Sequence, residues 1–304
     1  MKALATLTIA VSTAAFGQVI DPFYAGSYTY SDLGAVPGLP PQAGGLTLLA
    51  GTNNTLLIGG NANTAGGAIY AVGVSRDSSG HINAFTGTAT LHIEAPYNDG
   101  GIVYGPGGVL FASRWPVNEL AQYRPGSTTP DRIIDLAALG VASSNAAIQF
   151  VPSTYSGAGR MKLGSWSGGQ FYDATYEPDG AGTFTITSVT QTATLSGGPE
   201  GFAYVPTGSP LFGGPTLIVS EYTAGNVAVY DVDANGDPIE SSRRNFITGL
   251  TGAEGAFIDP LTGDFIFSTF GGGNRVIVVQ GFIPTPGTLT LACGAGLLAL
   301  RRRR

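Results

Sequence analysis

Four oxygen-bearing side chains recur at matching places in the chain, each beside small residues and ahead of a short apolar run. Glu200 and Glu254 lie in Gly198-Pro-Glu-Gly201 and Gly252-Ala-Glu-Gly255, the same pattern shifted by 54 positions. Asp99 and Asn145 open the related segments Asp-Gly-Gly-Ile-Val-Tyr and Asn-Ala-Ala-Ile-Gln-Phe. Ca²⁺ accepts six to eight oxygen ligands in a loose geometry. These residue types predict a site for Ca²⁺ or another divalent cation if the fold brings the four positions together. The alternative is that the glycines form turns and each polar side chain caps a backbone N–H.

The spacing of these segments indicates a repeat architecture. With the further echo Ala43-Gly-Gly-Leu-Thr-Leu-Leu-Ala50, five copies recur at intervals of 46 to 56 residues. Short β-branched and aromatic runs follow each copy, separated by Gly, Pro, Asn and Asp turns, so most units divide into four short antiparallel strands. Such units are typical of propeller blades.

We therefore predict an all-β fold, a closed β-propeller of four-stranded blades over residues 18–282. Five blades are favoured and six are the alternative. A β-sandwich or two smaller β domains would also use short strands, but the regular spacing and the absence of a linker argue against them. The fifth unit stops one strand short, and we assign its missing strand to Phe23–Tyr30, which would close the ring and leave no raw edge. Asp135–Val141 indicates a short helix.

The composition fits a turn-rich β protein and excludes one class of partner. The chain has 47 Gly, 19 Pro and only 11% charged residues. Its net charge is −6, and near −11 if both ends are removed with Lys2 and four arginines. We expect no nucleic-acid partner, since nucleic-acid binding requires a basic surface. The single cysteine, Cys293, allows no disulfide within the propeller.

Residues 1–17 have the pattern of a secretory signal peptide. Lys2 supplies the positive charge, Ala3–Ala15 is apolar, and Ala15-Phe-Gly17 is a small-x-small cleavage site. A buried helix is the alternative. The pattern predicts export of the mature chain.

Residues 283–304 contain Pro284, Thr285, Pro286 and Gly287, then an apolar run to Leu300, then Arg301, Arg302, Arg303 and Arg304. The run is shorter than the roughly 20 residues of a spanning helix, and the arginines would stay on the cytoplasmic side. This arrangement resembles the PEP-CTERM sorting tail of exported bacterial proteins, with Thr285 where that family has Glu. The resemblance implies transient insertion in the inner membrane and removal by an exosortase-type transpeptidase. A nonspecific tail anchor is the alternative.

Residues 200–280 resemble gluconolactonase-like and NHL-repeat propellers. The resemblance rests on Val229-Tyr-Asp-Val-Asp-Ala-Asn-Gly-Asp-Pro238 and on the second Gly-x-Glu-Gly segment. It implies a metal ion at the mouth of the channel, for which Glu200 or Glu254 is the matching residue type. The chain has Ala253-Glu-Gly255 where that family has Pro-Asp-Gly. We therefore carry over the fold and not the activity.

Other residues that could do chemistry have simpler explanations. Asp231-x-Asp233-x-Asn235-Gly-Asp237 matches half of an EF-hand loop, but Ser242 occupies the position of the final carboxylate, so we expect an acidic hairpin. The two histidines, His81 and His92, have no metal-binding spacing. Trp115 and Trp166 each follow the second strand of a unit, where packing between blades is favoured over a platform for sugars.

Together these features predict an exported propeller that acts as a binding or structural module at the cell surface or in the extracellular matrix. A polysaccharide or a surface protein is the expected kind of partner. No catalytic residue is assigned, and a non-enzymatic role is favoured. The alternative function is a metal-dependent hydrolase or lactonase that uses Glu200 and Glu254 at the central channel.

Overall fold

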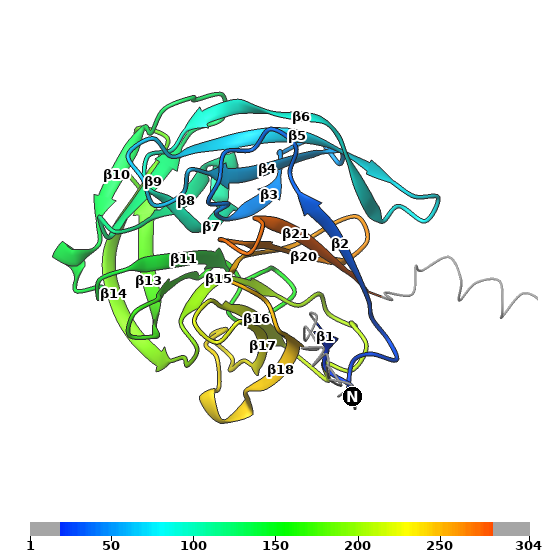
Figure 1. Ribbon diagram of the computed structural model, residues 1–304. Coiled ribbons are helices and arrows are strands. Elements are labelled where there is room, and N and C mark those ends of the chain that lie inside the picture. The colour runs from blue at the N-terminus through cyan, green and yellow to red at the C-terminus, as the bar shows by residue number, and fades with distance from the viewer. Residues whose placement is uncertain (1–18, 282–304) are drawn as a thin grey trace, which may run out of the picture.

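The computed structural model describes residues 19–281, which form five sheets around a central axis (Figure 1). The predicted signal peptide and sorting tail lie outside the described residues. The predicted five-bladed β-propeller is confirmed. Within residues 19–281 no helix is long and apolar enough to cross a membrane.

Each blade is an antiparallel sheet whose strands follow one another from the axis outward. Blade 1 holds β3 (Leu46–Leu48), β4 (Thr55–Gly60), β5 (Ala68–Arg76) and β6 (Ile82–Glu94). Blade 2 holds β7 (Asn98–Tyr104), β8 (Leu110–Arg114), β9 (Glu119–Tyr123) and β10 (Arg132–Asp135). Blade 3 holds β11 (Asn145–Phe150), β12 (Met161–Ser165), β13 (Gln170–Pro178) and β14 (Phe184–Thr194).

The last two blades each include a strand from the beginning of the chain. Blade 4 holds β15 (Pro199–Tyr204), β16 (Thr216–Glu221), β17 (Asn226–Asp231), β18 (Arg244–Thr248) and β1 (Val19–Ile20). Blade 5 holds β19 (Ala253–Ile258), β20 (Phe265–Thr269), β21 (Arg275–Gln280) and β2 (Thr29–Ala35). The helical turns of the described chain are three short 3₁₀ helices, at Pro106–Gly108, Ala137–Leu139 and Glu240–Ser242. The predicted helix at Asp135–Val141 is therefore one 3₁₀ turn.

The ring closes through β2, as the repeat count predicted. Tyr30 pairs with Val279 and Ser31 with Val278, so the beginning of the chain completes the sheet that its end leaves open. The predicted bounds were wrong, because the strand begins at Thr29 and the residues before it form hydrogen-bonded turns. The Tyr28 N–H donates to the Tyr24 carbonyl at 3.1 Å, and this spacing turns both rings into the core.

The segment before β2 ties blade 4 to blade 5. β1 was not predicted; it pairs with β18 through Val19↔Thr248 and Ile20↔Ile247. Tyr28 then packs against Phe212 and Phe246 of blade 4 and Phe265 of blade 5, with ring centroids 5.5 to 5.7 Å apart. The first residues of the described chain thus cover the outer edge of one blade and complete the next.

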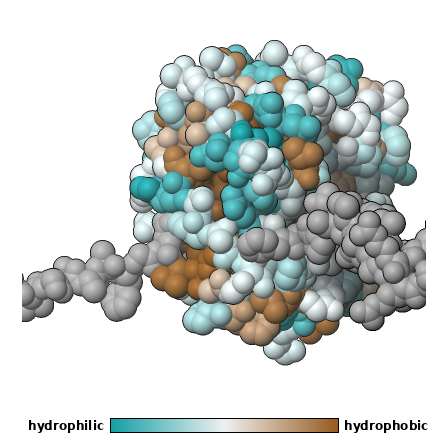
Figure 2. Space-filling model, turned by 90° about the vertical axis from the view of Figure 1, so that its right-hand side faces the viewer, coloured by the Kyte–Doolittle hydropathy of each residue, from teal (hydrophilic) through white to brown (hydrophobic). Residues whose placement is uncertain are grey.

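Apolar side chains fill the space between neighbouring blades. Phe171 of blade 3 and Phe202 of blade 4, for example, are both buried, with centroids 5.2 Å apart. Large hydrophobic side chains that remain exposed are scattered, and the face in Figure 2 shows only small separate hydrophobic patches. The burial of apolar surface between blades is the main force that holds the ring together.

The half EF-hand sequence is an acidic hairpin, as expected. The Asp233 carboxylate accepts hydrogen bonds from the N–H groups of Asn235 and Asp237 at 2.8 and 2.9 Å, which closes the turn. The Asp237 carboxylate lies 2.6 Å from the ammonium group of Lys162, which is fully buried in blade 3. Asp237 therefore neutralises a buried cation across the interface of two blades.

Candidate metal centre

Three of the four predicted acidic and amide side chains meet at one end of the central axis. One carboxylate oxygen from each of Asp99, Glu200 and Glu254 lies within 4.8 Å of the other two. Their exposed fractions are 1%, 6% and 1%. They come from blades 2, 4 and 5, so residues more than 150 positions apart share one small space.

The three acids converge because each lies in the irregular start of an innermost strand. Glu200 and Glu254 stand two residues before Phe202 and Ala256, where regular pairing with the second strand resumes. In blade 2 regular pairing resumes at Ile102, and Asp99 stands three residues before it, in a longer bulge. A bulge re-aims side chains that a regular strand would direct elsewhere.

Asn145 opens the innermost strand of blade 3 and pairs with Ser165, the last residue of the second strand, as Pro199 and Ala253 pair in blades 4 and 5. It stands two residues before Ala147, where regular pairing resumes, and it is fully buried. Neither atom of its side-chain amide has a hydrogen-bond partner. Asp99, Glu200 and Glu254 each follow that first paired residue, so the matching residue of blade 3 is Ala146 and three of the five blades carry an acid at this position.

The glycine after each glutamate allows the innermost strands to approach one another. A Cβ atom on Gly201 would lie 2.5 Å from the Ala256 nitrogen of blade 5. A Cβ atom on Gly255 would lie 2.8 Å from the Gly45 Cα atom of blade 1. Only the leading glycines, such as Gly252 with a φ of 66°, serve a turn. The second glycine of the motif thus serves the close approach of neighbouring blades.

Serine hydroxyls on the second strands fix these starts to the next blade. Ser268 Oγ accepts a hydrogen bond from the Gly255 N–H at 2.9 Å and donates to the Gly44 carbonyl of blade 1 at 2.6 Å. Ser113 plays the same part in blade 2, donating to the Ala146 carbonyl of blade 3 at 2.7 Å. Each of these serine hydroxyls therefore hydrogen-bonds both to the start of its own blade's innermost strand and to the backbone of the next blade.

We predict that Gly201→Ala destabilises the protein by about 1–3 kcal/mol, because the added methyl group meets backbone atoms that cannot rotate away. Gly214→Ala is the matched control, since nothing lies within 4 Å of a Cβ atom there and the expected change is small. Denaturant unfolding of both variants measures the difference. Equal stabilities would show that the close approach of blades 4 and 5 is not required.

The site has an excess of negative charge, and no basic side chain lines it. Asp99 Oδ2, Glu200 Oε2 and Glu254 Oε1 are buried without a hydrogen-bond partner. Burial raises the pKa of Asp99 to about 7. Burial, followed by repulsion from Asp99, raises the pKa of Glu200, and burial with repulsion from Glu200 and Asp99 raises that of Glu254. Buried ionised carboxylates are costly unless they are paired or bind a metal.

The donor atoms fit a hard divalent cation. Three carboxylates supply oxygen only, which suits Ca²⁺, Mg²⁺ or Mn²⁺ better than metals that prefer nitrogen or sulfur. The unpartnered oxygens are the atoms such an ion would bind. The structure therefore brings three of the four predicted residues, Asp99, Glu200 and Glu254, to one point.

These pKa shifts give a testable pH dependence for the cation-free protein. The carboxyl groups bind protons more tightly when folded than in the unfolded chain, where such groups titrate near pH 4. Stability should therefore fall as the pH rises from about 4 through about 7, the pKa of folded Asp99. Unfolding of chelator-treated protein across this range measures the slope. With saturating Ca²⁺ the fall should disappear, and a cation-free stability that rises over this range would contradict the assignment.

The acids form part of the lining of a cavity of about 250 Å³. Its other lining residues are the amides Gln42 and Asn63 and the aromatic residues Trp115, Trp166, Tyr222 and Phe270. Each aromatic residue is the first after the second strand of its blade. Trp166 and Tyr222 meet edge to face with centroids 6.2 Å apart. Trp166 thus packs against an aromatic residue of the next blade, as expected, and both tryptophans also line the cavity.

Four of these lining residues were not predicted from the sequence as site residues: Gln42, Asn63, Tyr222 and Phe270. A signal for the aromatic pair was present, because an aromatic residue recurs after the second strand of blades 2, 3, 4 and 5. The two amides carry no such signal, since they lie in loops of blade 1 that do not repeat.

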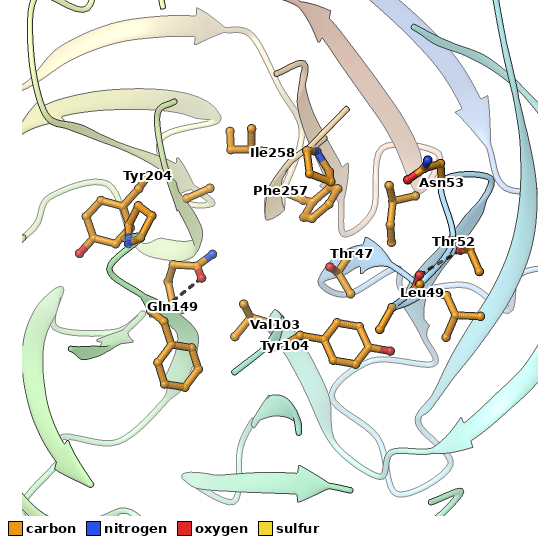
Figure 3. A pocket seen from close by; sticks show the side chains of 17 residues that line it. Thr47, Leu49, Thr52, Asn53, Val103, Tyr104, Gln149, Tyr204, Phe257 and Ile258 are labelled. Carbon is orange, nitrogen blue, oxygen red and sulfur yellow. Dashed lines mark hydrogen bonds between the residues drawn. The ribbon is translucent and has the colours of Figure 1, made fainter. Parts of the chain in front are cut away.

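The opposite end of the axis has a different character. A cavity of about 490 Å³ lies there, where the innermost strands end (Figure 3). Tyr104, Gln149 and Phe257 come from three blades and line it, and its lining contains no charged side chain. The acids therefore mark one mouth of the propeller and not the other.

The histidines lie away from the acids. His81 Nδ1 is 2.8 Å from the buried carboxylate of Asp264, which joins a hairpin of blade 1 to blade 5. His92 lies on the outermost strand of blade 1.

Comparisons with known proteins find similar folds only. No family model and no curated protein matches the chain. Similar solved structures include the PQQ domain of pyranose dehydrogenase from Coprinopsis cinerea, with 12% identity, 87% of this chain and 97% of that chain covered, and a TM-score of 0.48. An auxiliary nutrient binding protein from Bacteroides ovatus has 12% identity over 84% of this chain and 78% of its own, with a TM-score of 0.44. A proposed gluconolactonase has 13% identity over 86% and 96%, with a TM-score of 0.43.

Proposed function

We propose that this protein is a cation-dependent binding module. Asp99, Glu200 and Glu254 hold one Ca²⁺ ion at the mouth of the propeller. The ion presents its remaining coordination positions to a small ligand in the aromatic cavity. The observation that carries this proposal is that three buried carboxylates with unpartnered oxygens line one cavity.

A metal-dependent hydrolase or lactonase is the second candidate. The same open cavity supports it, because an ion with free coordination positions can polarise a carbonyl group and activate water. The lining of the cavity offers no histidine or lysine as a general base. A catalytic proton transfer would have to use one of the three carboxylates, which is why we place this candidate second.

Titration of the chelator-treated full-length chain with Ca²⁺ tests the proposal. We expect one ion per chain and a thermal shift that corresponds to about 2.7 kcal/mol at a hundredfold excess over the dissociation constant. The absence of binding by Ca²⁺, Mg²⁺ and Mn²⁺ would refute the site. Turnover of simple lactones by the Ca²⁺-loaded protein would favour the hydrolase instead.

We also propose that the chain is exported and processed at both ends. The signal-like residues 1–17 and the sorting-tail pattern of residues 283–304 support this. An acidic propeller with a calcium site suits an extracellular medium. Mass spectrometry of the exported protein tests the proposal, since an intact Arg304 would exclude removal of the tail.

A further inference from the structure

We propose that the aromatic cavity binds a single neutral sugar ring, held against the cation by two neighbouring hydroxyl groups. This inference rests on the proposed cation site and deepens it by naming the class of ligand. Three features of the cavity carry it: its walls, its size and its charge.

Four of the five blades each contribute one aromatic side chain to the wall of the cavity. Trp115, Trp166, Tyr222 and Phe270 come from blades 2, 3, 4 and 5 and stand at matching positions. They are only partly buried and belong to none of the hydrophobic clusters between blades. Aromatic side chains that border a cavity offer apolar surface to the apolar face of a ring.

The fifth side of the cavity is polar. Gln42 and Asn63 supply amide groups in the place where blade 1 has no aromatic residue. Both residues have a left-handed backbone, with φ angles of 63° and 66°, which is uncommon for residues other than glycine. Such conformations cluster at ligand sites. A ligand in this cavity therefore needs apolar faces together with hydroxyl groups at its edge, and a sugar ring has both.

The size of the cavity limits the ligand to one ring. Its volume of about 250 Å³ lies below the range of about 300–1,000 Å³ that drug-sized ligands occupy. The ligand is therefore a monosaccharide or the terminal residue of a longer chain.

The charge of the cavity favours a neutral ligand. Three carboxylates and one divalent cation leave one net negative charge, and no lysine, arginine or histidine lines the cavity. A sugar acid or a sugar phosphate would bring a second negative charge into a buried space without a positive side chain. A neutral sugar can share its adjacent hydroxyls with the cation at no such cost.

Tryptophan fluorescence gives a direct readout, because the only two tryptophans of the chain both line the cavity. The Ca²⁺-loaded full-length chain is titrated with glucose, galactose, mannose and glucuronate. We expect a saturable change in fluorescence with at least one of the neutral hexoses. The change should vanish when a chelator removes the cation, and glucuronate should bind at least tenfold more weakly than the best hexose.

Variants separate the sugar site from the cation site. Tyr222→Ala should weaken sugar binding at least tenfold and leave the Ca²⁺-induced thermal shift in place, and Phe270→Ala serves if the first variant fails to fold. Phe23→Ala removes an exposed aromatic residue elsewhere and is the control. If Ca²⁺ binds and no hexose changes the fluorescence, or if glucuronate binds best, this inference is wrong and the cation site stands. If no cation binds, the proposed function itself fails.

Discussion

Glu200→Gln is expected to lower the affinity of the protein for Ca²⁺ by at least about 100-fold, since changes next to metal ligands already cost 10–100-fold. The variant keeps the shape of the side chain and removes one of three carboxylates that approach a single point. The same substitution should make the cation-free protein more stable. Burial and repulsion from Asp99 already disfavour the ionised form of Glu200, as its raised pKa shows, and an amide carries no charge to bury.

Two measurements check this opposite pair of effects. Calorimetric titration gives the Ca²⁺ affinity, and thermal unfolding with a chelator gives the stability of the cation-free form. Glu177→Gln, which changes an exposed glutamate at the end of β13, is the matched control and should alter neither. Unchanged affinity in Glu200→Gln would remove this residue from the site. A loss of cation-free stability would show that its carboxylate has a partner within the protein.

Tyr28→Ala is expected to lower the free energy of unfolding by about 3–5 kcal/mol, the usual cost of removing a large buried aromatic ring. Tyr28 is 2% exposed and packs against rings from blades 4 and 5. Its hydroxyl donates to the Pro210 carbonyl at 2.7 Å. The substitution would leave a cavity at the place where the beginning of the chain closes the ring.

Denaturant unfolding measures this loss, and the Tyr28→Phe variant separates the contribution of the ring from that of the hydroxyl hydrogen bond. The phenylalanine variant keeps the ring and loses one hydrogen bond, so its expected cost is about 1 kcal/mol. A Tyr28→Ala cost as small as that of Tyr28→Phe would mean that the aromatic cluster does not hold blades 4 and 5 together.

The fold could be predicted from the sequence because its units repeat. Each blade buries its apolar faces against the next, so the same strand pattern returns around the ring. The strand β2, which closes the ring, was predicted in the correct blade but with wrong bounds. Between Phe23 and Tyr28, alternating aromatic and small residues look like a strand, but Tyr24 and Tyr28 are spaced for a turn of backbone that buries both rings. β1 has only two residues, too few for a pattern.

The convergence of the acids could be predicted for the same reason. Every innermost strand begins at one end of the axis, so residues at the same repeat position meet there. That the tryptophans line a cavity could not be predicted, because a large aromatic residue after a strand suits a core or a cavity equally well. The difference lies in the depth to which neighbouring loops bury it, which is set by tertiary structure and not by local sequence.

A crystal structure of the full chain grown with Ca²⁺ tests the central claim most directly. The account predicts one ion bound by oxygens of Asp99, Glu200 and Glu254 at about 2.3–2.6 Å. A well-ordered structure in which these three carboxylates bind no ion, and are instead hydrogen-bonded to one another or to water, would contradict it.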